Sequence, residues 1–170
     1  MISDTHGRLD EAVVECFRGV DHIVHAGDIG DENILDRLRA LAPLTAVAGN
    51  IDDFQCGDAG TEATAELGGL RLYVTHILDR PSKPIPAVNR TLERNPADIV
   101  VFGHSHLPHH EIVDGVLFFN PASAGPRRFD YPRSIGMIEI GRPDQVRAWH
   151  VPLDDLSKEA LGRYMNQLSR

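Results

Sequence analysis

The sequence predicts an α/β fold in which short buried strands alternate with amphipathic helices. The N-terminal third twice shows a stretch with helical periodicity followed by a short apolar segment. The rest of the chain contains pairs of apolar segments separated by glycine-containing turns, which are typical of antiparallel strands. A chain of 170 residues with 42% hydrophobic residues can bury one sizeable core. We therefore expect a single domain over residues 1–170.

The first elements alternate between helix and strand. Residues 10–17 carry apolar side chains at helical spacing, and Gly19 follows as a C-terminal stop. Residues 22–26 and 44–48 are short apolar strands. Between them, Asp31 is placed to cap a helix. That helix has one apolar face, made of Ile34, Leu35, Leu38 and Leu41. This order is typical of a parallel sheet covered by helices.

The middle of the chain changes character. Residues 62–67 and 70–74 flank a pair of glycines, which suits a hairpin. Three prolines predict a stiff loop over residues 77–86, before a helix that runs to about Arg94. Residues 98–102 then form a strongly apolar strand.

The C-terminal part predicts two further antiparallel pairs. Residues 111–113 pair with residues 116–119 across an Asp-Gly turn. Residues 135–140 pair with residues 146–151 across a turn rich in Gly, Pro and Asp. A helix over about residues 155–168 closes the chain.

Composition excludes several classes of partner. The formal charge of −8 argues against a long nucleic acid, because that binding mode relies on clustered Lys and Arg. We expect no membrane span, since no apolar stretch approaches twenty residues. The start shows no secretory signal, so we expect a cytoplasmic protein. Cys16 and Cys56 lie in unlike contexts, and we expect both to be reduced.

Five separated segments each end an apolar stretch with potential metal ligands. They are Ser3-Asp4-Thr5-His6-Gly7, Gly27-Asp28, Gly49-Asn50, Thr75-His76 and Gly103-His104-Ser105-His106. They supply two carboxylates, one amide oxygen and four imidazoles, enough for two divalent ions. In open α/β sheets the carboxyl ends of the strands converge on one crevice, so these side chains should meet. Any one of them alone could instead cap a helix or stabilise a turn. Together they indicate metal-dependent hydrolysis.

In this order, the motifs resemble those of the calcineurin-like metallophosphoesterase superfamily and, within it, the small YfcE-like phosphoesterases. Asp52 behind the Gly-Asn pair adds to the resemblance, and Asn120-Pro121-Ala122-Ser123 resembles the family's Asn-Pro-Gly-Ser turn. The match covers most of the chain. It implies a four-layer αββα sandwich with two mixed β-sheets and the helices outside.

The resemblance also implies how the ligands divide. One ion would be held by Asp4, His6 and His106, and the other by Asn50, His76 and His104. Asp28 would bridge both, because a carboxylate has two equivalent anionic oxygens. Mn²⁺ is the expected ion, with Ni²⁺, Zn²⁺, Co²⁺ or Fe²⁺ as alternatives.

The implied reaction is hydrolysis of a small phosphodiester, or a phosphomonoester, by a metal-bridging hydroxide. Asp28, Asn50 and His104 would be the catalytic residues. Asn50 would also hold the phosphoryl group, together with Arg127 or Arg128, although these two arginines could equally be a solvated charge pair. The alternatives are a non-catalytic metal-binding scaffold and a nucleotide or nucleic-acid phosphodiesterase. A homo-oligomer is compatible with each.

The sequence departs from the family pattern at three places. Ile51 stands where larger relatives carry a histidine that acts as leaving-group acid, so the general acid is unassigned. Ile77 and Leu78 replace the usual Gly-His. Only Met1 and Ile2 precede the first motif, which suggests an internal start and a shortened first strand. We expect weaker metal occupancy at Asp4 and His6 for that reason.

The other five histidines carry less information. His25 alternates onto a strand face near the site, where it either supports a ligand or packs in the core. Four others are expected on the surface or on strands: His22, His109, His110 and His150. His109 and His110 follow His106 closely enough to edge the site, and Trp149 is expected in the core.

Overall fold

The structure is a computed structural model that describes residues 1–53, 59–128, 130–141 and 145–154. The predicted helix over residues 155–168 and Cys56 lie outside the described residues. The elements follow in the order α1 (Glu11–Cys16), β1 (Ile23–His25), α2 (Glu32–Arg39), β2 (Leu44–Ala46), β3 (Glu62–Leu67), β4 (Leu70–Thr75), β5 (Asp79–Arg80), β6 (Lys83–Pro84), α3 (Pro86–Arg94), β7 (Ile99–Val101), β8 (Pro108–Val113), β9 (Val116–Pro121), β10 (Ser134–Ile140) and β11 (Val146–Pro152).

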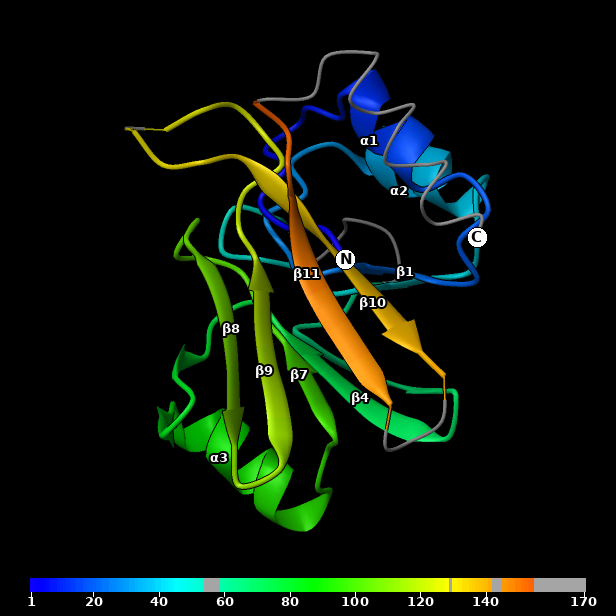
Figure 1. Cartoon of the computed structure of the whole chain (residues 1–170). Coiled ribbons are helices and arrows are strands. Elements are labelled where there is room, and N and C mark those ends of the chain that lie inside the picture. The colour runs from blue at the N-terminus through cyan, green and yellow to red at the C-terminus, as the bar shows by residue number, and fades with distance from the viewer. Residues whose placement is uncertain (54–58, 129, 142–144, 155–170) are drawn as a thin grey trace.

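One sheet has five strands in the order β3-β4-β7-β9-β8. Its centre is parallel, because β7 pairs in parallel with β4 on one side and with β9 on the other. The two edge strands are antiparallel to their neighbours, as the predicted hairpins require. Helix α3 covers one face of this sheet (Figure 1).

The second sheet is built around the first two residues of the chain. Strands β1 and β2 pair in parallel, and β10 and β11 pair antiparallel. The N–H of Ile2 donates to Val24 O at 2.8 Å, and the N–H of Gly136 donates to Met1 O at 2.9 Å. Residues 1–2 therefore join the β1–β2 pair to the β10–β11 pair in a mixed sheet.

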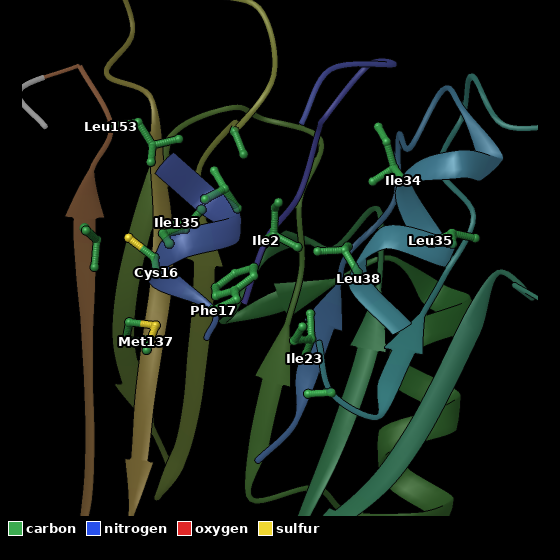
Figure 2. Packing of buried hydrophobic residues seen from close by; sticks show 14 of the residues in the cluster. Ile2, Cys16, Phe17, Ile23, Ile34, Leu35, Leu38, Ile135, Met137 and Leu153 are labelled. Carbon is green, nitrogen blue, oxygen red and sulfur yellow. The ribbon is translucent and has the colours of Figure 1, made fainter. Parts of the chain in front are cut away.

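Three buried clusters fill the spaces between four layers. Ile23, Phe17 and Leu38 belong to the cluster between the second sheet and helices α1 and α2 (Figure 2). Val24, Val74 and Val101 belong to the cluster between the two sheets. Tyr73, Val88 and Val100 belong to the cluster under α3. Alternate residues of β1, β4 and β7 thus face opposite layers, as the period of a strand requires. The four-layer αββα arrangement is confirmed.

Several boundaries differ from the predicted ones. The stiff loop over residues 77–86 contains a short antiparallel pair, β5 and β6. Strand β8 begins at Pro108 and pairs along six residues with β9, so it is longer than the predicted strand over residues 111–113. Residues 108–110 have no apolar alternation that would predict a strand. They are extended because they pair with the neighbouring strand β9. Asp31 caps α2 as predicted, accepting from the N–H of Asn33.

None of the described helices has the length and apolar character needed to cross a lipid bilayer.

Candidate metal centre

The candidate ligands lie at the carboxyl ends of parallel strands. Asp28 follows β1, Asn50 follows β2 and His76 follows β4 directly. His104 follows β7 by three residues, and Asp4 follows the two residues that pair beside β1. Segments far apart in the sequence are therefore brought to one edge of the fold.

The first group combines two carboxylates and two imidazoles. Asp4, His6, Asp28 and His106 each offer one ligand atom, and these atoms all lie within 4.8 Å of one another. Nε2 of His106 lies 3.2 Å from Asp4 Oδ1 and 3.2 Å from Nε2 of His6. Nε2 of His6 lies 3.7 Å from Asp28 Oδ2. Nitrogen and carboxylate ligands in one small volume suit a divalent transition metal.

The second group lies around the amide oxygen of Asn50. That oxygen is 3.1 Å from Nε2 of His76 and 2.9 Å from Nδ1 of His104. Nε2 of His76 is also 3.2 Å from Asp28 Oδ1. Asp28 therefore directs Oδ2 toward the first group and Oδ1 toward the second.

Two further observations show that these residues fit a cation. Asp4 Oδ1 is buried and has no hydrogen-bond partner among the described residues, a costly arrangement for a carboxylate oxygen. His76 Nδ1 lies 2.8 Å from the carbonyl oxygen of Ala26 and donates there, so Nε2 is the nitrogen that faces Asp28 and Asn50: without metal it can carry a proton toward Asp28, and on losing that proton it offers its lone pair to a cation. Such a bond fixes the tautomer that a metal-binding histidine needs.

The backbone of these residues is held in an uncommon conformation. Five candidate ligands have positive φ angles, namely Asp4 (53°), His6 (46°), Asp28 (52°), His104 (68°) and His106 (59°). Residues other than glycine rarely adopt this region, and each costs about 1–3 kcal/mol. Such conformations concentrate at functional sites, where the surrounding structure enforces them.

Two glycines let neighbouring segments approach the ligands. A Cβ at Gly49 would collide with the carboxylate and backbone of Asp28. A Cβ at Gly103 would collide with the Ser3 hydroxyl and approach Asp4 Oδ2. Only glycine fits at these two positions.

The electrostatics keep Asp28 available as an anion. Burial opposes the charge of its carboxylate, but the hydrogen bond and charge of His76 and the N–H of Ile51 outweigh burial and lower the pKa of Asp28 to about 2. Burial and the nearby Arg128 guanidinium lower the pKa of His6, which favours the neutral imidazole. An ionised carboxylate and a neutral imidazole are the forms that bind metal ions.

Asp52 joins two of the ligand-bearing loops, a role that the sequence reasoning did not assign. Its carboxylate accepts from the N–H groups of Ile29 at 3.0 Å, Gly30 at 2.8 Å and Gly49 at 2.8 Å. It thus fixes the segment after Asp28 against the segment that carries Asn50. The signal in the sequence was an aspartate just after a Gly-Asn turn, since such side chains often bond nearby backbone N–H groups.

The Asn-Pro-Ala-Ser turn supports two other ligand loops. The side-chain amide of Asn120 donates to Gly103 O at 2.8 Å and lies 3.2 Å from Ser105 Oγ. The Ser123 hydroxyl donates to Asp4 O at 2.9 Å. The turn therefore holds both the His104–His106 segment and the first motif.

His25 supports the motif loops from behind. It has no exposed surface, and burial lowers its pKa to about 4. Its Nδ1 accepts from the N–H of Gly27 at 3.2 Å, and its Nε2 lies 3.0 Å from Thr5 Oγ1. It therefore contacts the residues that flank the candidate ligands and bonds to none of those side chains.

The two arginines differ in position. A guanidinium nitrogen of Arg128 lies 3.4 Å from Nδ1 of His6. Arg127 is exposed, and its side chain forms no hydrogen bond or ion pair with a candidate ligand among the described residues. Only Arg128 is thus brought to the metal centre.

The other histidines lie outside the ligand groups. His22 pairs with Thr45, and His109 pairs with Glu111. His150 stacks on Phe119, with ring centroids 4.4 Å apart. Trp149 is partly buried against the cluster under α1 and α2.

Comparisons with known proteins agree with this geometry. The family model for the calcineurin-like phosphoesterase superfamily domain matches residues 1–142. A probable metallophosphoesterase from Methanothermobacter thermautotrophicus is 30% identical over 145 residues, covering 82% of this chain and 84% of the relative. Phosphodiesterase YfcE from Escherichia coli K12 is 30% identical over 163 residues, covering 81% of this chain and 84% of the relative.

The fold is also similar to that of a eukaryotic protein, Vps29. Vps29 from Entamoeba histolytica, in a crystal structure with Zn²⁺, superimposes with a TM-score of 0.71 over 92% of both chains. The two sequences are 22% identical, so this likeness concerns the fold alone.

Proposed function

This chain belongs to the calcineurin-like phosphoesterase superfamily, and we propose that it is a phosphoesterase that hydrolyses phosphodiesters, and phosphomonoesters less readily, with two divalent metal ions. The family supports a metal-dependent phosphoesterase in general terms. The pair of ions and the preference for diesters are our proposal.

One observation carries the proposal of two ions. The two oxygens of Asp28 face different groups of ligand atoms, with Oδ2 3.7 Å from His6 and Oδ1 3.2 Å from His76. Each group has further nitrogen and oxygen donors of its own. A carboxylate placed in this way is suited to bridge two cations.

The protein's own residues would bind and orient the substrate. A pair of divalent cations supplies Lewis-acid stabilisation of the phosphoryl oxygens and activation of an attacking water. Asn50 contributes an uncharged oxygen, which limits the negative charge that an anionic ester meets. Arg128 would leave His6 and donate to a phosphoryl oxygen, because a His6 that binds metal through Nε2 carries its proton on Nδ1 and cannot accept there.

The residues near Asn50 also limit the choice of leaving group. Ile51 follows Asn50 and has no proton to donate to a leaving oxygen. We therefore favour an ester with a good leaving group, since such an oxygen leaves without protonation. Mn²⁺ as the ion, a small substrate and a cytoplasmic location complete the proposal.

The test is hydrolysis of an aryl phosphodiester and the matching monoester by metal-stripped protein, with Mn²⁺, Ni²⁺, Zn²⁺ and Mg²⁺ returned separately. We expect turnover to return with metal and to be lost in Asp28→Ala and His104→Ala. His109→Ala is the control, because His109 lies on β8 and pairs with Glu111.

Two results would contradict the proposal. Full metal-dependent turnover by Asp28→Ala would contradict the bridging role. Binding of two ions without turnover of either ester would favour a protein-interaction scaffold instead.

A further inference from the structure

Large apolar side chains are exposed beside the metal centre. Among the described residues, the exposed large hydrophobic side chains are Ile51 (47%), Ile77 (36%), Leu107 (43%), Ile112 (68%) and Tyr131 (39%). Ile51, Ile77 and Leu107 each directly follow a candidate ligand in the chain. We call these three residues the apolar rim.

The backbone places the apolar rim at the site. The N–H of Ile51 donates to Asp28 Oδ1 at 3.1 Å, so its main chain contacts the carboxylate shared by both ligand groups. Ile77 and Leu107 follow His76 and His106, and consecutive Cα atoms are about 3.8 Å apart. The three side chains thus arise from three different loops, each one residue from a candidate ligand.

Two of the rim residues are exposed although the ligands beside them are buried. His76 and His106 are buried, whereas Ile77 and Leu107 are exposed. Ile77 and Leu107 therefore lie on the solvent side of the ligands that they follow, and Ile51 is exposed together with Asn50. A single exposed apolar side chain needs no explanation, but apolar side chains from separate segments around one centre are typical of a binding surface.

The charged and apolar parts of the site suggest a division of roles. Arg128, beside His6, and the cations that the ligand groups would hold favour an anionic phosphoryl group. The apolar rim offers no hydrogen-bond donor or acceptor side chain to the hydroxyls of a sugar or the edges of a base. It gains binding energy only by covering an apolar group.

We propose that Ile51, Ile77 and Leu107 bind the ester group of a phosphodiester substrate, so that the enzyme prefers diesters with an aryl or alkyl group to those with a sugar or nucleoside. This inference rests on the proposed phosphodiesterase activity. It adds the chemical class of the group that the substrate carries beyond its phosphorus.

The test compares diesters that share a p-nitrophenyl leaving group and differ in the other ester group, which is methyl, hexyl or a thymidine 5′-oxygen. We expect kcat/KM to be at least about tenfold higher for the hexyl than for the methyl diester, because a fully buried methylene contributes about 0.8 kcal/mol, or about fourfold. The thymidine diester should be no better than the methyl diester.

The rim variants are Ile51→Ser, Ile77→Ser and Leu107→Ser, separately and combined. We expect the ratio of kcat/KM for hexyl over methyl to fall toward one as they accumulate. Ile112→Ser is the matched control, because Ile112 is the most exposed of these side chains but lies on β8, away from any candidate ligand in the sequence. It should keep the wild-type ratio.

The outcomes separate this inference from the proposed function. If metal-loaded wild type hydrolyses none of the three diesters, the proposed function fails. If it hydrolyses methyl and hexyl diesters equally, or if the rim variants keep the preference, the activity stands and the role of the rim is wrong. If the rim variants change self-association but keep the hexyl-over-methyl ratio of kcat/KM, the rim is a contact between copies of the chain. That result also overturns the inference.

Discussion

The Thr5 hydroxyl lies 3.0 Å from Nε2 of His25, inside the protein and behind the candidate metal centre. Because the N–H of Gly27 donates to Nδ1 of His25, the neutral imidazole carries its proton on Nε2 and donates it to Thr5. Thr5 in turn donates to Ile29 O at 2.9 Å. This series of hydrogen bonds connects the segment of Asp4 and His6 to the segment that carries Asp28.

We predict that Thr5→Val destabilises the protein and weakens metal binding. The substitution keeps the shape of the side chain but leaves the buried N–H of His25 without a partner, which costs about 1–3 kcal/mol, and removes one of the two hydrogen bonds that Ile29 O accepts, the other coming from the N–H of Gly7. Urea denaturation and metal titration measure the two effects.

The chain offers a matched control in Thr45→Val. Thr45 pairs with His22 at 2.8 Å, but this pair is only partly buried and lies outside the ligand groups. We expect Thr45→Val to lower the free energy of unfolding by less than about 1 kcal/mol and to leave the metal affinity unchanged. If Thr5→Val and Thr45→Val lose equal stability and equal metal affinity, the Thr5–His25 pair does not support the metal centre.

His25 should also make stability depend on pH. Burial lowers its pKa from 6.5 to about 4, so between these values the unfolded chain binds a proton at His25 that the folded protein does not. The free energy of unfolding should therefore fall as pH decreases from about 6.5 to about 4, by up to about 1.4 kcal/mol per pH unit. Urea denaturation of chelated protein across this range should show a shallower slope for His25→Gln than for wild type. An unchanged slope would mean that His25 does not lose its charge on folding.

Asp52→Ala should lower both stability and metal affinity. Its carboxylate accepts from three backbone N–H groups on two ligand-bearing segments, and losing it should cost about 1–3 kcal/mol. Asp53→Ala is the control, because Asp53 is exposed and should change stability by no more than about 0.5 kcal/mol. Denaturation curves that coincide for the two variants would contradict the role of Asp52 in joining the segments.

Arg128→Ala and Arg127→Ala should differ in their effect on substrate binding. Arg128 lies beside His6, so its loss should raise KM for a phosphodiester by about fivefold, the effect of one exposed ionic contact. Arg127→Ala should leave KM close to that of wild type. Steady-state kinetics of the metal-loaded protein measure both, and equal increases would indicate a general effect of surface charge.

Much of the site could be predicted from the sequence, because its signal is local. Asp28 and His76 follow short apolar segments, and the carboxyl ends of parallel strands converge. The nearly continuous apolar runs in residues 70–74 and 98–102 also reflect the two layers that β4 and β7 contact.

The remaining features depend on contacts between distant segments. The bonds of Met1 to Gly136 and of Asp52 to Ile29 join parts of the chain that no periodicity relates. The burial of His25 likewise depends on its pairing with Ile2 and its hydrogen bond with Thr5, both distant in the chain, so the sequence left two roles open for it. The weaker metal occupancy expected at Asp4 and His6 stays a prediction.

The most direct test of the account is the number of metal ions bound per chain, measured together with turnover of an aryl phosphodiester in wild type, His6→Ala and His76→Ala. If Asp28 bridges two ions, wild type binds two, each variant retains one, and both variants lose turnover. A wild type that binds one ion and remains fully active, or a His76→Ala variant that retains both full turnover and full metal content, would contradict the proposed two-metal centre.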